Sequence, residues 1–332
     1  MRAIQIVTLD GPDAVQLNEV PQPEAGDGQV LIRVRAAGVS FPELLQTRGL
    51  YQFKPPPPFT PGSEVAGDVV SAPQGSGLAP GDRVASMVML GGFAEYALGT
   101  LDGTFKLPDA LSYAEGAALP LNYLTCHFAL VTRAHIQPGE VVLVHGAAGG
   151  VGTAAIQTAK AFGAGRVIAV ASTEEKRAVA LAAGADDAVP ADGFLDALKE
   201  LPGFGTEFDG VDIVVDPVGG DRFTDSLRSL RRHGRILVIG FADEGHIPEV
   251  KVNRLLLRNT SVVGVGWGEY ALTNLPFLRE QWAALLPHIE SGIIKPPVGA
   301  EFDLADAAKA LTQMDGRGAL GKIVLTTGQA DE

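Results

Sequence analysis

The order of apolar and polar positions divides the chain into two regions with different periodicities. Over roughly the first 120 residues, short runs alternate between apolar and polar side chains and are separated by glycine or proline, which is typical of strands. The clearest runs are 30–39, 65–70 and 82–88, and the four prolines at 55–58 force an extended loop. This region is predicted to form a small, irregular β barrel or sandwich.

From Leu121 onward, short apolar strands alternate with amphipathic helices, which indicates a parallel sheet with right-handed crossovers. The strands are expected at 141–144, 167–170, 188–189, 211–215, 235–239 and 261–265, with helices at 153–162, 174–183, 194–200 and 222–230. Six parallel strands in two halves form the doubly wound dinucleotide fold, whose ligands lie at the carboxyl ends of the strands.

The C-terminal part continues with a predicted helix at 277–289 and a predicted strand at 322–325. This last strand has no obvious place among the six parallel ones. The C-terminus is therefore expected to return to the first domain.

Residues 141–152 contain an apolar strand, a glycine-rich turn and the start of a helix. The N-terminus of a helix presents unpaired amides and a partial positive charge, so a pyrophosphate can bind there. Gly149 permits its close approach, and Gly152 lets the helix pack on the strand. The match to G-x-G-x-x-G is partial, because Ala147 stands at the first glycine, and a turn that serves packing alone is the alternative. The flanking strand and helix favour dinucleotide binding.

Composition and charge narrow the class of protein. The 332 residues are 46% apolar, enough for two domains, and the net charge of −13 argues against a nucleic-acid or anionic-membrane surface. The start of the chain alternates like a strand rather than a signal peptide, and no apolar run is long enough to cross a bilayer. A soluble cytoplasmic protein is expected. The single cysteine, Cys126, excludes an internal disulfide and a multi-cysteine zinc site, and its apolar surroundings favour a buried, inert thiol.

Five segments, at 37–39, 61–67, 81–84, 92–96 and 145–152, carry a resemblance to a known family. In this order the chain resembles the medium-chain dehydrogenase/reductase superfamily, and within it the zinc-independent NADPH:quinone oxidoreductase (zeta-crystallin-like) branch. The resemblance implies a GroES-like β-barrel catalytic domain, a doubly wound six-stranded Rossmann domain that binds NADPH, and a C-terminal segment that returns to the catalytic domain. The expected ranges are 1–121, 122–265 and 266–332.

The branch is also indicated by what the chain lacks. Zinc alcohol dehydrogenases of this superfamily hold catalytic zinc with a cysteine and a histidine near the region of Ser40, and have a four-cysteine structural lobe. This chain has neither feature, so the resemblance implies hydride transfer without zinc. The short-chain family is excluded, because none of the five tyrosines is followed by a lysine four residues later.

The end of the second parallel strand bears on the choice of cofactor. NAD-preferring sites place an acidic residue there, whereas this strand ends in Ser172 and Thr173. Ser172 can donate to a phosphate, and Lys176 lies one helical turn further, where family members carry a phosphate-binding lysine. NADPH is therefore expected. Lys176 could instead be a solvated charge, and residues 190–192 depart from the family's Asn-Tyr-Arg triplet, so phosphate affinity is weaker or Arg177 substitutes.

The resemblance also implies the remaining site residues. Cofactor contacts are expected from Thr125, Ala147, Gly149, Gly150, Val151, Gly152, Gly240, Phe241, Val265, Trp267 and Arg317. Arg317 could equally be the charge of a surface turn. Ser40 stands where most relatives have asparagine, and its hydroxyl can still form a hydrogen bond. Tyr51 aligns with an active-site tyrosine that could bind a carbonyl oxygen, but it could also anchor its loop, and solvent could deliver the proton.

The remaining interpretations concern His145, the aromatic side chains, the function and the assembly. His145 is interpreted as a packed, hydrogen-bonded histidine, and Phe41 as a core residue. Aromatic side chains suit a planar substrate. The expected function is NADPH-dependent reduction of quinones or other α,β-unsaturated carbonyls; the alternatives are a 2-haloacrylate or enoyl-type reductase and a non-catalytic, crystallin-like NADPH-binding protein. A homodimer is expected through the edge strand 261–265.

Overall fold

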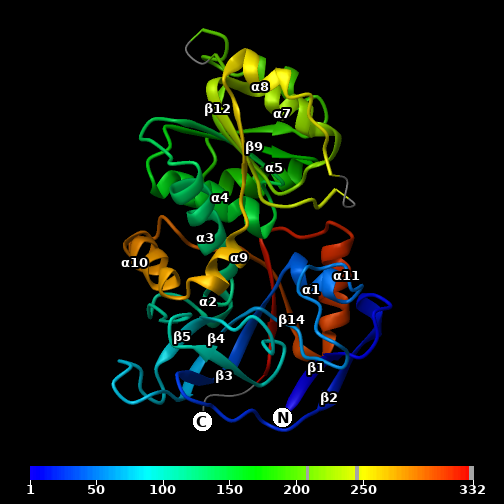
Figure 1. Ribbon diagram of the computed structural model, residues 1–332, viewed down its shortest axis with the longest axis vertical. Coiled ribbons are helices and arrows are strands. Elements are labelled where there is room, and N and C mark those ends of the chain that lie inside the picture. Colours follow the sequence, from blue (N-terminus) through cyan, green and yellow to red (C-terminus); the bar gives the residue numbers. More distant parts are fainter. Residues whose placement is uncertain (207–208, 244–246, 329–332) are drawn as a thin grey trace. The chain divides into compact units, whose positions relative to one another are not determined.

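The computed structural model of the protein describes residues 1–206, 209–243 and 247–328 (Figure 1). Contacts divide the chain into two compact units. The first comprises Met1–Asn122, Asn274–Ala284 and Pro296–Glu332, and the second comprises Tyr123–Thr273 and Leu285–Lys295. Each unit is built around a sheet of its own.

The first unit contains a seven-stranded sheet and a two-stranded one. The order in the larger sheet is β14-β15-β3-β4-β5-β7, and β6 also pairs with β3. The strands are β1 (Arg2–Ile6), β2 (Val15–Glu19), β3 (Gln29–Val39), β4 (Glu64–Ser71), β5 (Arg83–Met87), β6 (Tyr96–Thr100), β7 (Thr104–Lys106), β14 (Val298–Asp303) and β15 (Lys322–Thr326). The predicted β region is therefore present, and the last strand, β15, pairs antiparallel with β3.

Strand β3 is the centre of this sheet because it pairs with three strands, β4, β6 and β15. Its inward side chains, Val30, Ile32 and Val34, are fully buried, as the alternating sequence predicts. The pairing with β4 shifts register twice, and such bulges increase the twist of a strand. The helices assigned wholly to this unit are α1 (Phe41–Gln46), α2 (Tyr113–Gly116) and α11 (Ala307–Asp315).

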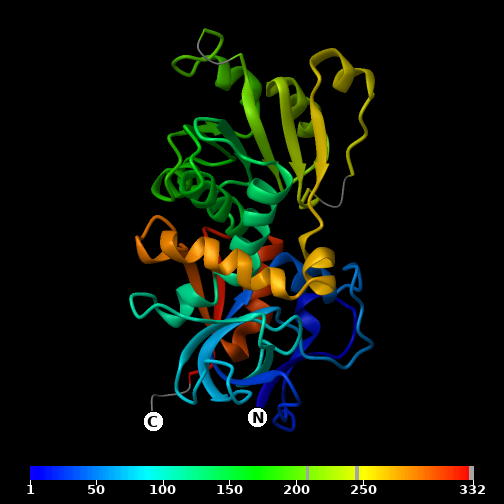
Figure 2. The ribbon, with the colours of Figure 1, turned by 60° about the vertical axis from the view of Figure 1, so that its left-hand side comes forward.

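The second unit contains six parallel strands in the order β10-β9-β8-β11-β12-β13. Strands of this sheet are seen in Figure 2, coloured from green to yellow. They are β8 (Val141–His145), β9 (Arg166–Ala171), β10 (Asp187–Pro190), β11 (Val211–Asp216), β12 (Leu230–Val238) and β13 (Ser261–Gly264). In chain order this is 3-2-1-4-5-6, the order of the doubly wound dinucleotide fold. The predicted fold class is confirmed.

Helices connect these strands. They are α4 (Gly150–Ala161), α5 (Glu174–Ala182), α6 (Phe194–Lys199), α7 (Phe223–Ser229), α8 (Asn253–Arg258) and α9 (Trp267–Thr273), while α3 (Pro120–His127) and α10 (Pro276–Glu290) contain residues of both units. Phe194 and Leu198 of α6 pack with Phe223 and Leu227 of α7 in the core formed with the sheet. None of the helices in the described ranges is both long and apolar enough to cross a membrane.

Two predicted boundaries in this unit are wrong. Strand β12 begins at Leu230, five residues before the expected Arg235, because Leu230 already pairs with Val211 of β11. The pairing shifts register before Arg235, in the stretch where His233 has a φ of 64°. Helix α4 begins at Gly150 rather than Thr153. Glycine is a poor helix former, but here the packing on the turn overrides its propensity.

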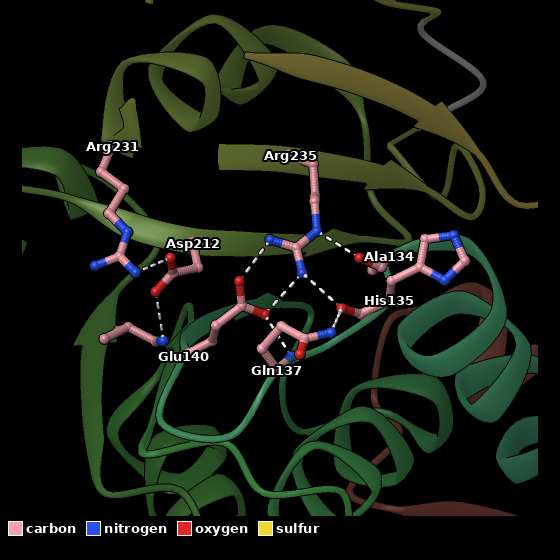
Figure 3. A network of polar contacts seen from close by, with 8 residues as sticks. Ala134, His135, Gln137, Glu140, Asp212, Arg231 and Arg235 are labelled. Atoms are coloured by element: carbon pink, nitrogen blue, oxygen red, sulfur yellow. Dashed lines mark hydrogen bonds and ion pairs between the residues drawn. The ribbon is translucent and has the colours of Figure 1, made fainter. Parts of the chain in front are cut away.

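Ion pairs connect the amino ends of three central strands of this sheet (Figure 3). Arg235 of β12 donates to both carboxylate oxygens of Glu140, at 2.8 and 2.7 Å, and to the carbonyl oxygen of Ala134 at 2.7 Å. Asp212 of β11 forms an ion pair with Arg231 and accepts a hydrogen bond from the amide that opens β8. The network fixes the edge of the sheet opposite to its carboxyl ends.

Candidate functional site

The turn between β8 and α4 depends on glycine. Gly146 has a φ of 58°, and Gly149, the N-cap of α4, has an extended backbone with φ −80° and ψ 175°. A Cβ atom at Gly152 would lie 2.2 Å from the carbonyl oxygen of Gly146 and 2.6 Å from the Cα atom of Ala147. Helix and turn are therefore in direct backbone contact at Gly152, which is the close packing that the sequence predicts.

The start of α4 has the form of an anion cradle. The nearest atom to a Cβ at Gly149 would be the carbonyl oxygen of Gly146, at 3.5 Å, so the backbone is open there. The amides of residues 150–152 lie in the first turn of the helix, where no intrahelical acceptor exists. An open backbone and amides without intrahelical acceptors fit a pyrophosphate group.

Ala147, at the first position of the glycine motif, points inward. It is fully buried, and its amide donates to the carbonyl oxygen of Val170 at 3.3 Å. A methyl group is thus accommodated inside the fold without obstructing the turn. This explains why the partial motif match is compatible with the cradle.

The other predicted cofactor residues of this unit follow the carboxyl ends of its strands. Ser172 comes directly after β9, Gly240 and Phe241 follow β12, and Val265 and Trp267 follow β13. Parallel strands end at one edge of a sheet, so these residues share the edge of the glycine-rich turn. Thr125 lies in α3 and is half-buried.

The segment after β9 presents hydroxyl and cationic groups. Ser172 is exposed, and Thr173 caps α5 by accepting the amide of Lys176 at 3.2 Å. Lys176 and Arg177 are half-buried, and Arg177 also donates to the carbonyl oxygen of Ala171 at 3.4 Å. Lys176 thus lies in the first turn of α5, as the sequence predicts.

Two reactive side chains of this unit are buried. His145 Nε2 lies 2.8 Å from Ser226 Oγ, and its ring packs edge-on against Phe194. Burial lowers the pKa of His145 to about 4, so the ring is neutral at physiological pH. Burial also raises the pKa of the Cys126 thiol well above its usual range. The predicted packing of the histidine and the predicted burial of the cysteine are confirmed.

In the first unit, Ser40 belongs to a buried polar cluster. Lys322 Nζ, at the start of β15, lies 2.5 Å from Ser40 Oγ and 2.5 Å from Glu64 Oε1. Glu64 Oε2 accepts the amide of Leu121 at 2.7 Å. Glu43 accepts the amide of Ser40 at 2.9 Å and the hydroxyl of Ser63. Segments far apart in the chain therefore surround Ser40 with charge.

The five side chains of this cluster are at most 6% exposed. It contains two carboxylates, Glu43 and Glu64, and one ammonium group, that of Lys322. Burial raises the pKa of Glu43 to about 6; the hydrogen bond from Ser63 and the charge of Lys322 oppose this rise, and the charge of Glu64 adds to it. Glu43 therefore takes up a proton more readily than an exposed glutamate does.

Gly38 makes room for the ion pair. A Cβ atom there would lie 2.6 Å from Glu64 Oε1, 2.8 Å from Lys322 Cε and 2.5 Å from the carbonyl oxygen of Ala117. The last of these is a backbone atom, so the crowding could not be relieved by side-chain movement alone. Glycine at this position is required by the cluster.

Three further predicted residues lie in the first unit. Tyr51 is half-buried, and burial and the charge of Glu43 raise its pKa. Arg317 follows α11 in a turn with a φ of 56°, which is uncommon for a residue other than glycine. Phe41 is 37% exposed, so its interpretation as a core residue is wrong; it is the first residue of the short helix α1.

The sequence interpretation missed Glu43 and Lys322, and recognised Glu64 only as part of a motif. Charged residues beside apolar strands were a usable signal, since such positions are rarely buried without a partner. Over the described ranges, no group of three or more His, Cys, Asp or Glu side chains is placed to hold a metal ion.

Comparisons with known proteins identify the family. Residues 26–109 match the alcohol dehydrogenase GroES-like domain, and residues 150–291 match the zinc-binding dehydrogenase family. Quinone oxidoreductase-like protein 2 of Rattus norvegicus is 38% identical over 328 residues, which cover 98% of this chain and 92% of that protein.

Solved structures agree with this assignment. A probable oxidoreductase from Mycobacterium abscessus superposes with a TM-score of 0.88 at 43% identity, covering 98% of each chain. The quinone oxidoreductase from Thermus thermophilus, also solved in complex with NADPH, has a TM-score of 0.83 at 36% identity and covers 98% of this chain and 100% of its own. The first unit thus has the GroES-like fold and the second the Rossmann fold. The chain is an oxidoreductase and belongs to the quinone oxidoreductases of the medium-chain dehydrogenase/reductase superfamily.

Proposed function

We propose that the protein is an NADPH-dependent reductase of quinones or other α,β-unsaturated carbonyl compounds. The observation that carries the proposal is the cradle at Gly149–Gly152, with open backbone and first-turn amides that have no intrahelical acceptor, at the carboxyl end of β8. The Thermus thermophilus relative, which is similar over almost the whole chain, was solved in complex with NADPH. When bound, NADPH supplies the hydride.

The preference for NADPH over NADH rests on the segment that follows β9. Ser172 and Thr173 separate the strand from the first carboxylate, Glu174, and Lys176 lies in the first turn of α5. A 2′-phosphate would gain charge-assisted hydrogen bonds from Ser172 and Lys176, whereas a ribose 2′-hydroxyl would lack the carboxylate partner of NAD sites. Arg177, next to Lys176, adds a second cationic group and takes the place of the Asn-Tyr-Arg triplet found in the family.

The residues of the protein itself bind and orient the substrate. Ser40 and Tyr51 are the proposed hydrogen-bond donors to its carbonyl oxygen, and a neutral Tyr51 is favoured because its pKa is raised. The ammonium group of Lys322 already places a cation 2.5 Å from Ser40 Oγ, which favours a reaction without zinc.

Steady-state NADPH oxidation with 1,4-benzoquinone, 9,10-phenanthrenequinone and 2-haloacrylate tests the function. Turnover with the two quinones supports the proposal, and turnover with 2-haloacrylate alone favours the enoyl-type alternative. Tight NADPH binding without turnover of any acceptor would instead favour a non-catalytic binding protein.

The proposed assembly is a homodimer through strand β13. This strand lies at the end of the sheet and pairs with β12 on one side. Val262 is 41% exposed, and Leu256 and Leu257 of α8 are 76% and 72% exposed, which is a large apolar surface beside an open strand edge. A second copy paired about a two-fold axis would cover both.

Sedimentation of the wild type and of Val262→Lys tests the dimer. A wild-type dimer that becomes a monomer on substitution supports it, because a charge would be buried in the new interface. Leu181→Lys, at a 45% exposed position on α5, is the matched control and should leave the dimer intact. A monomeric wild type would contradict the proposal.

A further inference from the structure

Lys322 is an unusual residue to find inside the first unit. It is 3% exposed, opens strand β15, and forms an ion pair with Glu64, which is 0% exposed. Removing two charges from water costs free energy that their attraction does not necessarily recover, and apolar replacements of such pairs are often as stable. A purely stabilising role is therefore a weak explanation for the pair.

The geometry of the cluster determines how Ser40 forms hydrogen bonds. An ammonium group is only a donor, so Ser40 Oγ accepts from Lys322 across 2.5 Å. The hydroxyl donates to Glu64 Oε1 at 3.4 Å, which is long for a hydrogen bond between oxygen atoms. The hydroxyl hydrogen can turn to a better acceptor.

The backbone of Ser40 is held as well. Its amide donates to Glu43 Oε2 at 2.9 Å, while the other oxygen of Glu43 accepts from Ser63. Side chain and backbone are thus fixed from two sides by separate buried partners. Preorganised donors of this kind are effective where negative charge develops during a reaction.

We propose that Lys322 is a positioning residue of the reductase: it holds the Ser40 hydroxyl as a donor to the substrate oxygen that becomes negative during hydride transfer, with Glu64 balancing its charge. The inference rests on the proposed function. A C–H bond forms on the electrophilic carbon as the C–H bond that holds the hydride in the reduced cofactor breaks. The π electron pair of the enone or quinone shifts to the carbonyl oxygen, and the cofactor is left oxidised. A proton from solvent then neutralises the enolate or phenolate.

The cation contributes through the hydroxyl. A donor that itself accepts a hydrogen bond from an ammonium group is polarised, so its bond to an anion is stronger than that of an isolated serine. Because the negative charge appears only as the hydride arrives, the interaction favours the transition state over the bound substrate.

The test is a double-mutant cycle. Ser40→Ala is expected to lower kcat and kcat/KM for an enone by about 10²-fold, with the Kd for NADPH unchanged. Ser40→Thr, which keeps the hydroxyl, should recover most of the loss. The paired variant Lys322→Gln with Glu64→Gln removes both charges together, so that no unpaired charge remains buried, and should lose about tenfold or more.

Non-additivity is the decisive result. If Lys322 acts through Ser40, adding Ser40→Ala to the paired variant causes no further loss. Additive losses, or wild-type turnover in the paired variant, would overturn the inference. If the paired variant fails to fold, Lys322→Arg is used in its place, because it keeps the positive charge but displaces the hydrogen-bond donors. Unchanged turnover in Lys322→Arg would also overturn the inference. Failure of the proposed function is detected separately, in the wild type, which would then oxidise NADPH with none of the acceptors.

Discussion

Gly152 touches the backbone of Gly146 so closely that a single added methyl group would overlap it: the Cβ atom would lie 2.2 Å from the carbonyl oxygen. Neither partner is a flexible side chain, so helix α4 would have to move away from the turn. The contact fixes where the first amides of the helix point.

Gly152→Ala is therefore expected to destabilise the protein by about 3 kcal/mol and to abolish NADPH binding, because overpacking against backbone cannot be relieved locally. Urea denaturation and a fluorescence titration with NADPH measure the two effects. Gly149→Ala is the matched control: its Cβ would make only an ordinary 3.5 Å contact, so the fold should stay intact. If Gly149→Ala bound NADPH as tightly as the wild type, the turn would not be the pyrophosphate site.

The cofactor preference should respond to Lys176. Lys176→Ala is expected to lower the ratio of kcat/KM for NADPH to that for NADH by about tenfold, since one charge-assisted hydrogen bond to the 2′-phosphate is lost. Lys199→Ala, on the surface of α6 beside Asp196, removes the same charge elsewhere and should leave the ratio unchanged. Equal use of both cofactors by the wild type, with no effect of Lys176→Ala, would contradict the assignment.

Glu43 should make stability fall as pH rises. Its folded pKa of about 6 lies above the unfolded value of 4.5, so the folded state binds the proton more tightly between these values. From pH 4.5 to above 6 the wild type is expected to lose about 2 kcal/mol through this group, with no further change at higher pH. Glu43→Gln stays neutral and should lack this decline. Denaturation of both proteins at pH 4.5, 5.5 and 7 checks it, and parallel curves would show that Glu43 is not perturbed.

The local sequence pattern was sufficient to predict the sheet of the second unit. It was not sufficient to predict the buried polar cluster around Ser40 in the first unit. The strand at 141–145, its glycine turn and the following helix are contiguous, and their periodicities are visible in a short window. The pairing of Lys322 with Ser40 spans 282 residues. It arises because β15 pairs with β3, which places Ile323 opposite Val39. No local rule connects a lysine before an apolar strand to a serine near the other end of the chain.

The burial of individual side chains in helix α1 also could not be predicted from residue type. Phe41 is apolar and was expected in the core, yet its position at the start of a six-residue helix leaves it 37% exposed. Glu43, two residues later in the same helix, is charged and 0% exposed, because Ser63 and the amide of Ser40 satisfy its oxygens. The burial of Glu43 therefore depends on its hydrogen-bond partners, which residue type alone does not reveal.

The Arg235–Glu140 pair should matter for stability and not for cofactor binding. Arg235 holds both carboxylate oxygens of Glu140 at the amino ends of the strands (Figure 3), away from the glycine-rich turn. Arg235→Met is expected to cost about 3 kcal/mol, because it leaves a largely buried carboxylate without its partner. Urea denaturation at pH 7 and a titration with NADPH measure the two properties; Arg228→Met, in an exposed pair with Asp225, is the control and should cost little.

The pH dependence of the stability lost in Arg235→Met gives an independent check of the role of the Arg235–Glu140 pair. Burial raises the pKa of Glu140, but the hydrogen bonds from Arg235 and from the amide of Gln137 outweigh it, so the net pKa is lowered. The stabilisation from a lowered pKa is present above the unfolded value of 4.5 and is lost as pH falls through the folded value. The difference in stability between the wild type and Arg235→Met should therefore shrink below pH 4.5. A difference that stays constant in acid would mean that Arg235 acts through its bond to the carbonyl of Ala134 rather than through the carboxylate.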